Sequence, residues 1–281
     1  HEESDITDRP WIAEDSPVLA VWLEENSEGL DVIARALESP DYCAPIVRAD
    51  ESLSLYNSLS GDDYRLSRSF ARGFQARAYY RIAQGDVDGA IDDIIACARL
   101  GRLSGQNGTI VHRLVGIACE GIAAAIGIAL TEESSPTEAQ LQRLLDAWND
   151  LPSRCPHEET LKIERLFFLE FIQGLALDEY SLDSEGSFDN PVAQSLIKLD
   201  HDWNVVLRRV NLHYAALIRG NELYRLEETW RSWQRWSPIR LFTLGTSPSE
   251  SFGDMLSTSY MPYTPAAREA GRRCQCCNQL H

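Results

Sequence analysis

The chain has 281 residues, of which 44% are hydrophobic and 25% are charged, so it is long enough for one large globular domain or two small ones. That composition excludes intrinsic disorder, a collagen-like repeat and a small disulfide-rich scaffold. Its 43 acidic residues outnumber its 26 basic residues and give a formal charge of −17, which repels polyphosphate over most of the surface. We therefore expect no nucleic-acid partner.

Apolar residues recur at intervals of three and four along the chain rather than alternating, which predicts helices and at most marginal sheet. The predicted fold class is all-α, an irregular α-α bundle or solenoid of antiparallel helices. We expect residues 1–281 to form a single helical domain. A subdivision into an N-terminal half, 1–150, and a C-terminal half, 151–281, with a long loop at 237–262, is the alternative.

Two helices are predicted near the N-terminus. Ser16-Pro17 begins the first, because proline is tolerated at the first helical position. Asn26 or Ser27 is expected to cap the second, and Ser39-Pro40-Asp41 to end it.

The clearest hairpin follows over residues 69–98. A ladder of apolar residues four apart predicts a helix over 69–84 that ends at Gly85, where we expect a positive φ. Asp86 is expected to cap the next helix, with Asp92 and Asp93 facing water on its polar side. Two amphipathic helices joined this closely predict an antiparallel pair.

The helix predicted over 109–130 is apolar nearly all round, which favours a central position in the fold. Its weakly charged stretch, 114–130, is interrupted by Glu120 and falls short of the roughly twenty apolar residues of a membrane span, so we interpret it as a buried helix. Gly116, Gly121 and Gly127 are expected to let neighbouring helices approach closely.

The second half of the chain continues the helical pattern. Ser135 is predicted to cap a helix, with Pro136 at its first position and Glu138 completing a capping box. Further helices are expected from Pro156 to Leu175, from Pro191 to Arg219, after Gly220, and from Thr264 onward.

Residues 76–91, ARAYYRIAQGDVDGAI, resemble one tetratricopeptide-type helical hairpin, with glycine at the turn and small residues where the helices cross. Only one copy is clear, whereas a repeat array needs about three. The resemblance therefore predicts an irregular bundle with one such hairpin.

The same region extends into a broader resemblance. Residues 93–100 (DIIACARL), 114–123 (LVGIACEGIA) and 202–211 (DWNVVLRRVN), and more weakly 22–26 (WLEEN), are similar to a family of uncharacterised planctomycete proteins. Members of that family tend to carry an N-terminal membrane anchor and a further C-terminal region. The resemblance implies a helical, extracytoplasmic, membrane-anchored protein whose only membrane contact is an anchor outside this chain.

Metal-ligand residue types cluster at His157-Glu158-Glu159 and at Asp200-His201-Asp202. Neighbouring residues point to different sides of a helix, so neither triplet can enclose a metal alone, and solvated helix-end charges are the competing interpretation. At the C-terminus, Cys274, Cys276 and Cys277 offer one pair at most, where a zinc site needs four ligands. Packing, oxidation and metal binding all remain open for these cysteines.

Glu120 is the most informative single residue, because an ionised carboxylate within an apolar helix must reach a partner or water. We expect it to be buried and paired with Arg113, two turns earlier on the same face, or with Arg77 from the preceding hairpin. This pair either ties helices together or forms the polar floor of a binding groove.

A second candidate binding stripe lies on the helix expected from Pro191. Asn204 and Asn211 are seven residues apart and share one face, with His201 and Arg208 near the same stripe. Such a face can bind a peptide backbone or can simply be solvated.

Recognised catalytic signatures are missing: there is no Gly-x-Ser-x-Gly, no Walker loop and no Gly-x-Gly-x-x-Gly, so we expect no cofactor. Our first hypothesis is a non-catalytic helical scaffold that binds a protein or peptide partner through Arg77, Arg113, Glu120, His201, Asn204, Arg208 and Asn211. The alternative is a metal-assisted hydrolase that uses Asp200 to Asp202 with Glu120 or His157.

Overall fold

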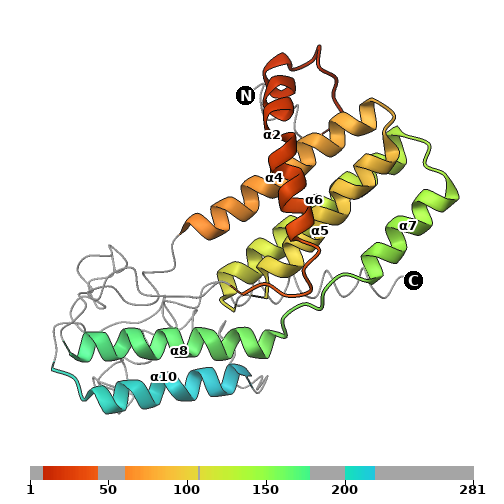
Figure 1. The fold of residues 1–281 in the computed structure, drawn as a ribbon. Coiled ribbons are helices and arrows are strands. Elements are labelled where there is room, and N and C mark those ends of the chain that lie inside the picture. Colours follow the sequence, from red (N-terminus) through yellow and green to blue (C-terminus); the bar gives the residue numbers. More distant parts are fainter. Residues whose placement is uncertain (1–8, 44–60, 107, 178–199, 219–281) are drawn as a thin grey trace, which may run out of the picture. The chain divides into compact units, whose positions relative to one another are not determined.

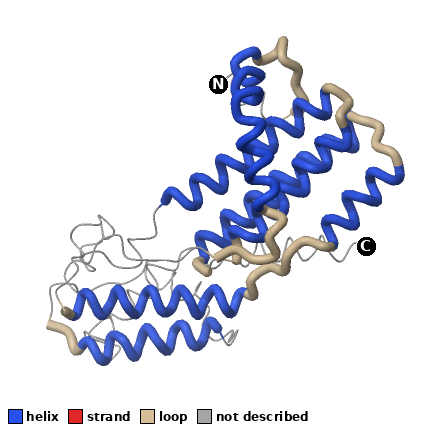
Figure 2. Tube along the Cα trace, in the orientation of Figure 1, coloured by secondary structure: helices blue, strands red, loops and turns tan. Residues whose placement is uncertain are grey.

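The computed structural model describes residues 9–43, 61–106, 108–177 and 200–218 (Figure 1). Within these ranges every regular element is helical and no strand occurs (Figure 2), which confirms the expected all-α class and the antiparallel packing. In chain order the described helices are α2 (Pro17–Ala36), α4 (Gly61–Ala83), α5 (Val87–Ser104), α6 (Ile110–Glu133), α7 (Glu138–Asn149), α8 (His157–Ala176) and α10 (Trp203–Ile218).

The described residues belong to two compact units that meet in sequence at Cys155 and Pro156. The first unit holds the helices from α2 to α7, and the second holds α8 and α10. The expected division into 1–150 and 151–281 stays a prediction.

The core of the first unit is a bundle of three helices, α4, α5 and α6, each of which packs against the other two (Figure 1). Small side chains fill much of this core, which lets the helices approach closely. Phe74 and Ile91 add bulk and have no exposed surface. The fully buried small residues of the three helices are Ala71, Ala78, Ala90, Cys97, Ala98, Cys119 and Ala123.

Two further helices flank this three-helix bundle. Helix α2 crosses α4, and α7 packs along α5 (Figure 1). The segment before α2 is fixed by Trp11, whose indole Nε1 donates to the carbonyl of Ala76 at 3.1 Å and whose ring lies 5.0 Å from that of Tyr80.

The hairpin between α4 and α5 is formed as expected. Gly85 has a φ of +76°, the left-handed conformation that an L side chain disfavours. Asp86 caps α5, because its carboxylate accepts from the backbone N–H of Gly89 at 3.0 Å. This turn holds α4 and α5 antiparallel and places residues equidistant from it opposite each other.

Helices α5 and α6 touch backbone to backbone at one pair of glycines. A Cβ added at Gly101 would lie 2.6 Å from the carbonyl oxygen of Gly116, and one added at Gly116 would lie 2.4 Å from that of Gly101. The expectation for Gly116 is therefore confirmed. It is wrong for Gly121 and Gly127, around which an added Cβ would meet nothing within 4 Å.

Helix α6 begins at Ile110, one residue after the expected start, and Thr109 caps it by accepting from the N–H of His112. It is less central than expected, because Ala118, Gly121 and Ile128 are exposed on its outer face. By length and composition α6 alone among the described helices would suffice to cross a membrane, a test that core helices also pass. Here its inner face packs on α4 and α5 and carries Glu120.

Three predicted helix boundaries are wrong. Helix α4 begins at Gly61, eight residues before the expected start at 69. Helix α2 runs unbroken from Pro17 to Ala36, and Asn26 donates its side-chain amide to the carbonyl of Trp22 at 2.8 Å instead of capping a second helix. The cap of α7 is Thr137 rather than Ser135, and its capping box is completed by Gln140 rather than Glu138.

In the second unit, α8 and α10 pack against each other through aromatic side chains, with the rings of Phe168 and Tyr214 6.1 Å apart. The long helix expected from Pro191 is wrong over residues 200–202, which are not helical. Helix α10 begins at Trp203 because the carboxylate of Asp202 accepts from the N–H of Asn204 at 3.0 Å.

Several predictions concern parts of the chain outside the described residues. They are the segment 191–199, the helix after Gly220, the loop at 237–262, and the helix from Thr264 with Cys274, Cys276 and Cys277.

Candidate functional site

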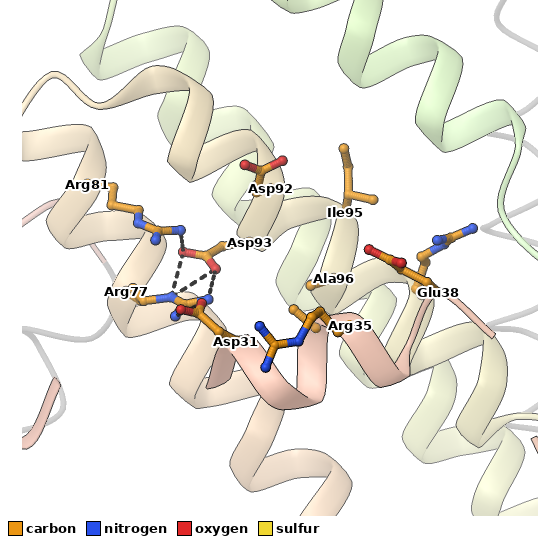
Figure 3. A pocket seen from close by; sticks show the side chains of 11 residues that line it. Asp31, Arg35, Glu38, Arg77, Arg81, Asp92, Asp93, Ile95 and Ala96 are labelled. Atoms are coloured by element: carbon orange, nitrogen blue, oxygen red, sulfur yellow. Dashed lines mark hydrogen bonds and ion pairs between the residues drawn. The ribbon is translucent and has the colours of Figure 1, made fainter. Parts of the chain in front are cut away.

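A cleft of about 420 Å³ in the first unit is walled by α2 and α5 and floored by α4 (Figure 3). Binding sites commonly have this volume, although most are lined chiefly by apolar side chains. Eight of the eleven lining residues are charged, so this cleft suits a polar or charged group. They are Asp31, Ala34, Arg35, Glu38, Arg77, Arg81, Asp92, Asp93, Ile95, Ala96 and Arg99.

At one end of the cleft, two arginines of α4 converge on Asp93 of α5 (Figure 3). Arg77 donates from Nη2 to Oδ1 of Asp93 at 2.7 Å and from Nε at 3.0 Å, and Arg81 donates from Nη1 to Oδ2 at 2.8 Å. Asp93 has no exposed surface. Both of its oxygens are therefore committed to guanidinium groups.

Arg77 also ties α2 to this cluster. Its Nη1 donates to Oδ1 of Asp31 at 2.7 Å and to the carbonyl of Ser27 at 3.1 Å. Burial lowers the pKa of Arg77, but its bonds to Asp93 and Asp31 outweigh burial and raise it. Burial raises the pKa of Asp93, against the opposing effect of Arg77 and Arg81. The cluster joins three helices and is costly to disturb.

The expectation that Asp93 faces water is thus wrong, and a sequence signal could have corrected it. Arg77 stands eight residues before Gly85 and Asp93 eight residues after it. Residues at equal distances from a tight antiparallel turn lie opposite each other, so a cation there predicts an ion pair across the hairpin.

The remaining charges of the cleft divide into paired and unpaired groups. Asp92 forms an ion pair with Arg143 of α7. Arg35 of α2, Arg99 of α5 and Glu38 line the cleft without an ion pair to any described residue. Among the described residues, two guanidinium groups and one carboxylate of the cleft therefore have no ion-pair partner.

Glu120 is buried and paired with arginine, as expected, but its partners are different. Its Oε2 lies 3.0 Å from Nε of Arg102, and Arg154 donates to both of its oxygens. Arg77 is occupied at Asp93, and Arg113 donates to the carbonyl of Cys155 at 2.6 Å. The predicted pairing of Glu120 with Arg113 or Arg77 is therefore wrong.

Glu120 pairs with Arg102 and Arg154 because the tertiary packing of the helices brings these residues together. Arg102 lies one residue after Gly101, where α5 and α6 touch, so its side chain starts beside Glu120. Arg154 follows α7 in the sequence and returns to α6. Burial lowers the pKa of Arg113, and the nearby charge of Arg154 lowers it as well. The carboxylate of Glu120 offsets the positive charge of the arginines around it, which favours a structural role for Glu120.

The candidate stripe of α10 is not continuous. His201 precedes the helix and is buried, with its ring 5.8 Å from that of Trp203. Asn204 and Arg208 are exposed, whereas Asn211 is half-buried with an amide oxygen that accepts no hydrogen bond from the described residues. The four residues do not share one exposed face.

Within the described ranges, no group of three or more histidine, cysteine, aspartate or glutamate side chains could hold a metal ion. His157 begins α8, and Asp200 to Asp202 precede α10. Glu120, the other acidic residue of the hydrolase hypothesis, is held by two arginines.

A second cavity, also of about 420 Å³, is lined mainly by apolar residues of α2, α4 and α5. Tyr42 and Leu66 lie at its edge, close in sequence to residues 44–60, which are outside the described part of the chain.

Comparisons with protein-family models, with curated proteins and with solved structures found no match to this chain.

Proposed function

We propose that this protein is a non-catalytic helical binding protein whose charged cleft between α2 and α5 binds a segment of a protein or peptide partner. The observation that carries this proposal is the cleft itself, an open cavity whose floor is held by ion pairs while its rim keeps charged groups that form no ion pair with the residues the structure describes. Peptide backbones and side chains offer both donors and acceptors to such a rim.

The composition of the cleft supports binding over catalysis. None of its eleven lining residues is a serine, threonine, cysteine, histidine, lysine or tyrosine. The buried carboxylate, Asp93, is hydrogen-bonded on both oxygens and is therefore a poor general base. The described residues that line the cleft thus offer no hydroxyl, thiol or amine nucleophile, and the buried carboxylate is not available as a base.

The rigidity of the cleft supports the same function. Arg77 joins α2, α4 and α5 at its floor, so the walls are held in place before any partner arrives. A preformed site spends less free energy on ordering itself when it binds.

The test is binding of the full chain to an array of random twelve-residue peptides. We compare wild type with Ala34→Leu, which narrows the cleft, and with Ala139→Leu, a matched change at an exposed position of α7. We expect peptides that bind wild type and Ala139→Leu alike and bind Ala34→Leu at least tenfold more weakly.

A double variant on α10, outside the cleft, serves as the second control. We expect the double variant Asn204→Ala/Arg208→Ala, changed at two exposed positions, to bind the same peptides as wild type. Absence of any peptide binding, or binding lost only in this α10 variant, would overturn the proposal.

A further inference from the structure

The charged groups of the cleft divide into those that form ion pairs and those that do not. Arg77 and Arg81 pair with Asp93, Asp31 and, outside the cleft, Asp86, whereas Arg143 from outside the cleft pairs with Asp92 and Asp88. The cations left over, Arg35 and Arg99, have no ion pair within the described part of the chain, and Glu38 is the one lining carboxylate left without one there. The unpaired groups thus carry two positive charges and one negative charge.

The two free guanidinium groups come from different walls. Arg35 lies in the last turn of α2 and is exposed, whereas Arg99 lies on α5 and is half-buried. The small residues Ala34 and Ala96 leave room beside them. A planar group placed in the cleft can therefore meet an arginine from either side.

Guanidinium groups bind carboxylates through paired, charge-assisted hydrogen bonds that are stronger than neutral ones. Glu38 and the half-exposed Asp31 lie on the α2 side and oppose an incoming anion. The repulsion from these carboxylates would offset the attraction of a single arginine, so both Arg35 and Arg99 are needed to hold the anionic ligand. Glu38 in turn can accept a hydrogen bond from a peptide N–H of the same ligand.

We propose that the cleft recognises a peptide through a single carboxylate held between Arg35 and Arg99. This inference rests on the proposed function and specifies the ligand of the same cleft. The formal charge of −17 repels strongly acidic segments, so the ligand carries one carboxylate among neutral or basic residues rather than an acidic run.

The experiment uses the full chain and matched sets of immobilised twelve-residue peptides with acetylated and amidated ends. Each set holds one sequence with a single glutamate, its glutamine counterpart, and a counterpart with four consecutive glutamates. A fourth member places a free C-terminal carboxylate in the glutamine sequence, which separates a side-chain source of the carboxylate from a terminal one.

We expect one carboxylate to strengthen binding at least tenfold over the glutamine peptide, and the acidic run to bind more weakly than the single glutamate. Arg35→Gln and Arg99→Gln should each reduce this preference to less than twofold. Arg72→Gln changes the net charge equally at an exposed position of α4 outside the cleft, and it should keep the full preference.

The outcomes separate this inference from the proposed function. Peptides that bind in the cleft with equal strength as glutamate and glutamine would overturn the carboxylate inference and leave the binding protein standing. A preference lost equally in Arg72→Gln would overturn the inference in favour of net charge. If Arg99→Gln does not fold by circular dichroism, the exposed position Arg35 decides the result, and binding of no peptide at all overturns both proposals.

Discussion

At the residue scale, Gly85 and Gly29 form a matched pair, because an added Cβ would meet nothing within 4 Å at either position. Only their backbones differ: Gly85 has a φ of +76°, whereas Gly29 lies within α2. Gly85→Ala should lower the free energy of unfolding by about 1–2 kcal/mol through left-handed strain. Gly29→Ala should raise it by about 0.5–1 kcal/mol, since alanine favours a helix. Urea denaturation of both variants measures the difference, and equal effects would mean that Gly85 does not need its conformation.

The two buried cysteines of α5 and α6 should be chemically inert. Burial raises the pKa of Cys119 to about 11 and also raises the pKa of Cys97. At pH 8 only about a thousandth of Cys119 would be thiolate, the reactive form. We expect iodoacetamide to label exposed Cys43 at least a hundredfold faster than either buried thiol, as measured by peptide mass spectrometry. Fast labelling of Cys97 in the folded protein would contradict the close packing of α5 on α6.

Glu120 tests whether the buried ion group stabilises the first unit. Glu120→Ala leaves Arg102 and Arg154 uncompensated and should cost about 3 kcal/mol, near the low end for a broken buried pair, because Arg154 is one-third exposed and can be hydrated. Glu132→Ala, at an exposed position of the same helix, should change stability by less than about 0.5 kcal/mol. Thermal unfolding of both variants checks this. A stable Glu120→Ala variant that no longer binds the array peptides would assign Glu120 to a binding site instead.

At the element scale, the crossing of α5 and α6 depends on glycine at one point. Gly101→Ala would place its Cβ against the backbone carbonyl of Gly116, which cannot rotate away, and should cost about 1–3 kcal/mol. Gly121 belongs to α6 and has open space around it, so Gly121→Ala should raise the free energy of unfolding by up to about 1 kcal/mol. Opposite signs in chemical denaturation are the expected result. A neutral Gly101→Ala variant would show that the two backbones do not touch there.

The starts of three helices could be predicted from sequence. Pro17 is the first residue of α2, Asp86 caps α5, and Thr109 immediately precedes α6. The start of α7 was misplaced because Ser135 with Glu138 and Thr137 with Gln140 both fit the capping-box spacing. Local sequence does not choose between them.

The candidate site could be predicted only in part. The sequence predicts Arg77 as a binding residue, and Arg77 lines the cleft. It does not directly predict that Asp93 is buried, although the distance of Asp93 from Gly85 places it opposite Arg77. The partners of Glu120 depend on how α5 crosses α6 and where the chain returns after α7. Neither arrangement is encoded in the spacing of nearby residues.

At the scale of the whole molecule, the net charge of −17 and the composition of the cleft act together. The overall charge disfavours polyanions, while in our proposal Arg35 and Arg99, which form no ion pair among the described residues, attract one carboxylate at short range. A weakly charged peptide segment satisfies both conditions.

The central claim is that a peptide binds in the cleft between α2 and α5, and photo-crosslinking tests it most directly. The probe is the tightest-binding array peptide with benzoylphenylalanine placed beside its glutamate, and the full chain is mapped by mass spectrometry after irradiation. The account predicts crosslinks to α2 and α5 within 31–38 and 92–99, competed by the unmodified peptide and lost in Ala34→Leu. Crosslinks concentrated at 203–211, or unchanged by Ala34→Leu, would contradict it.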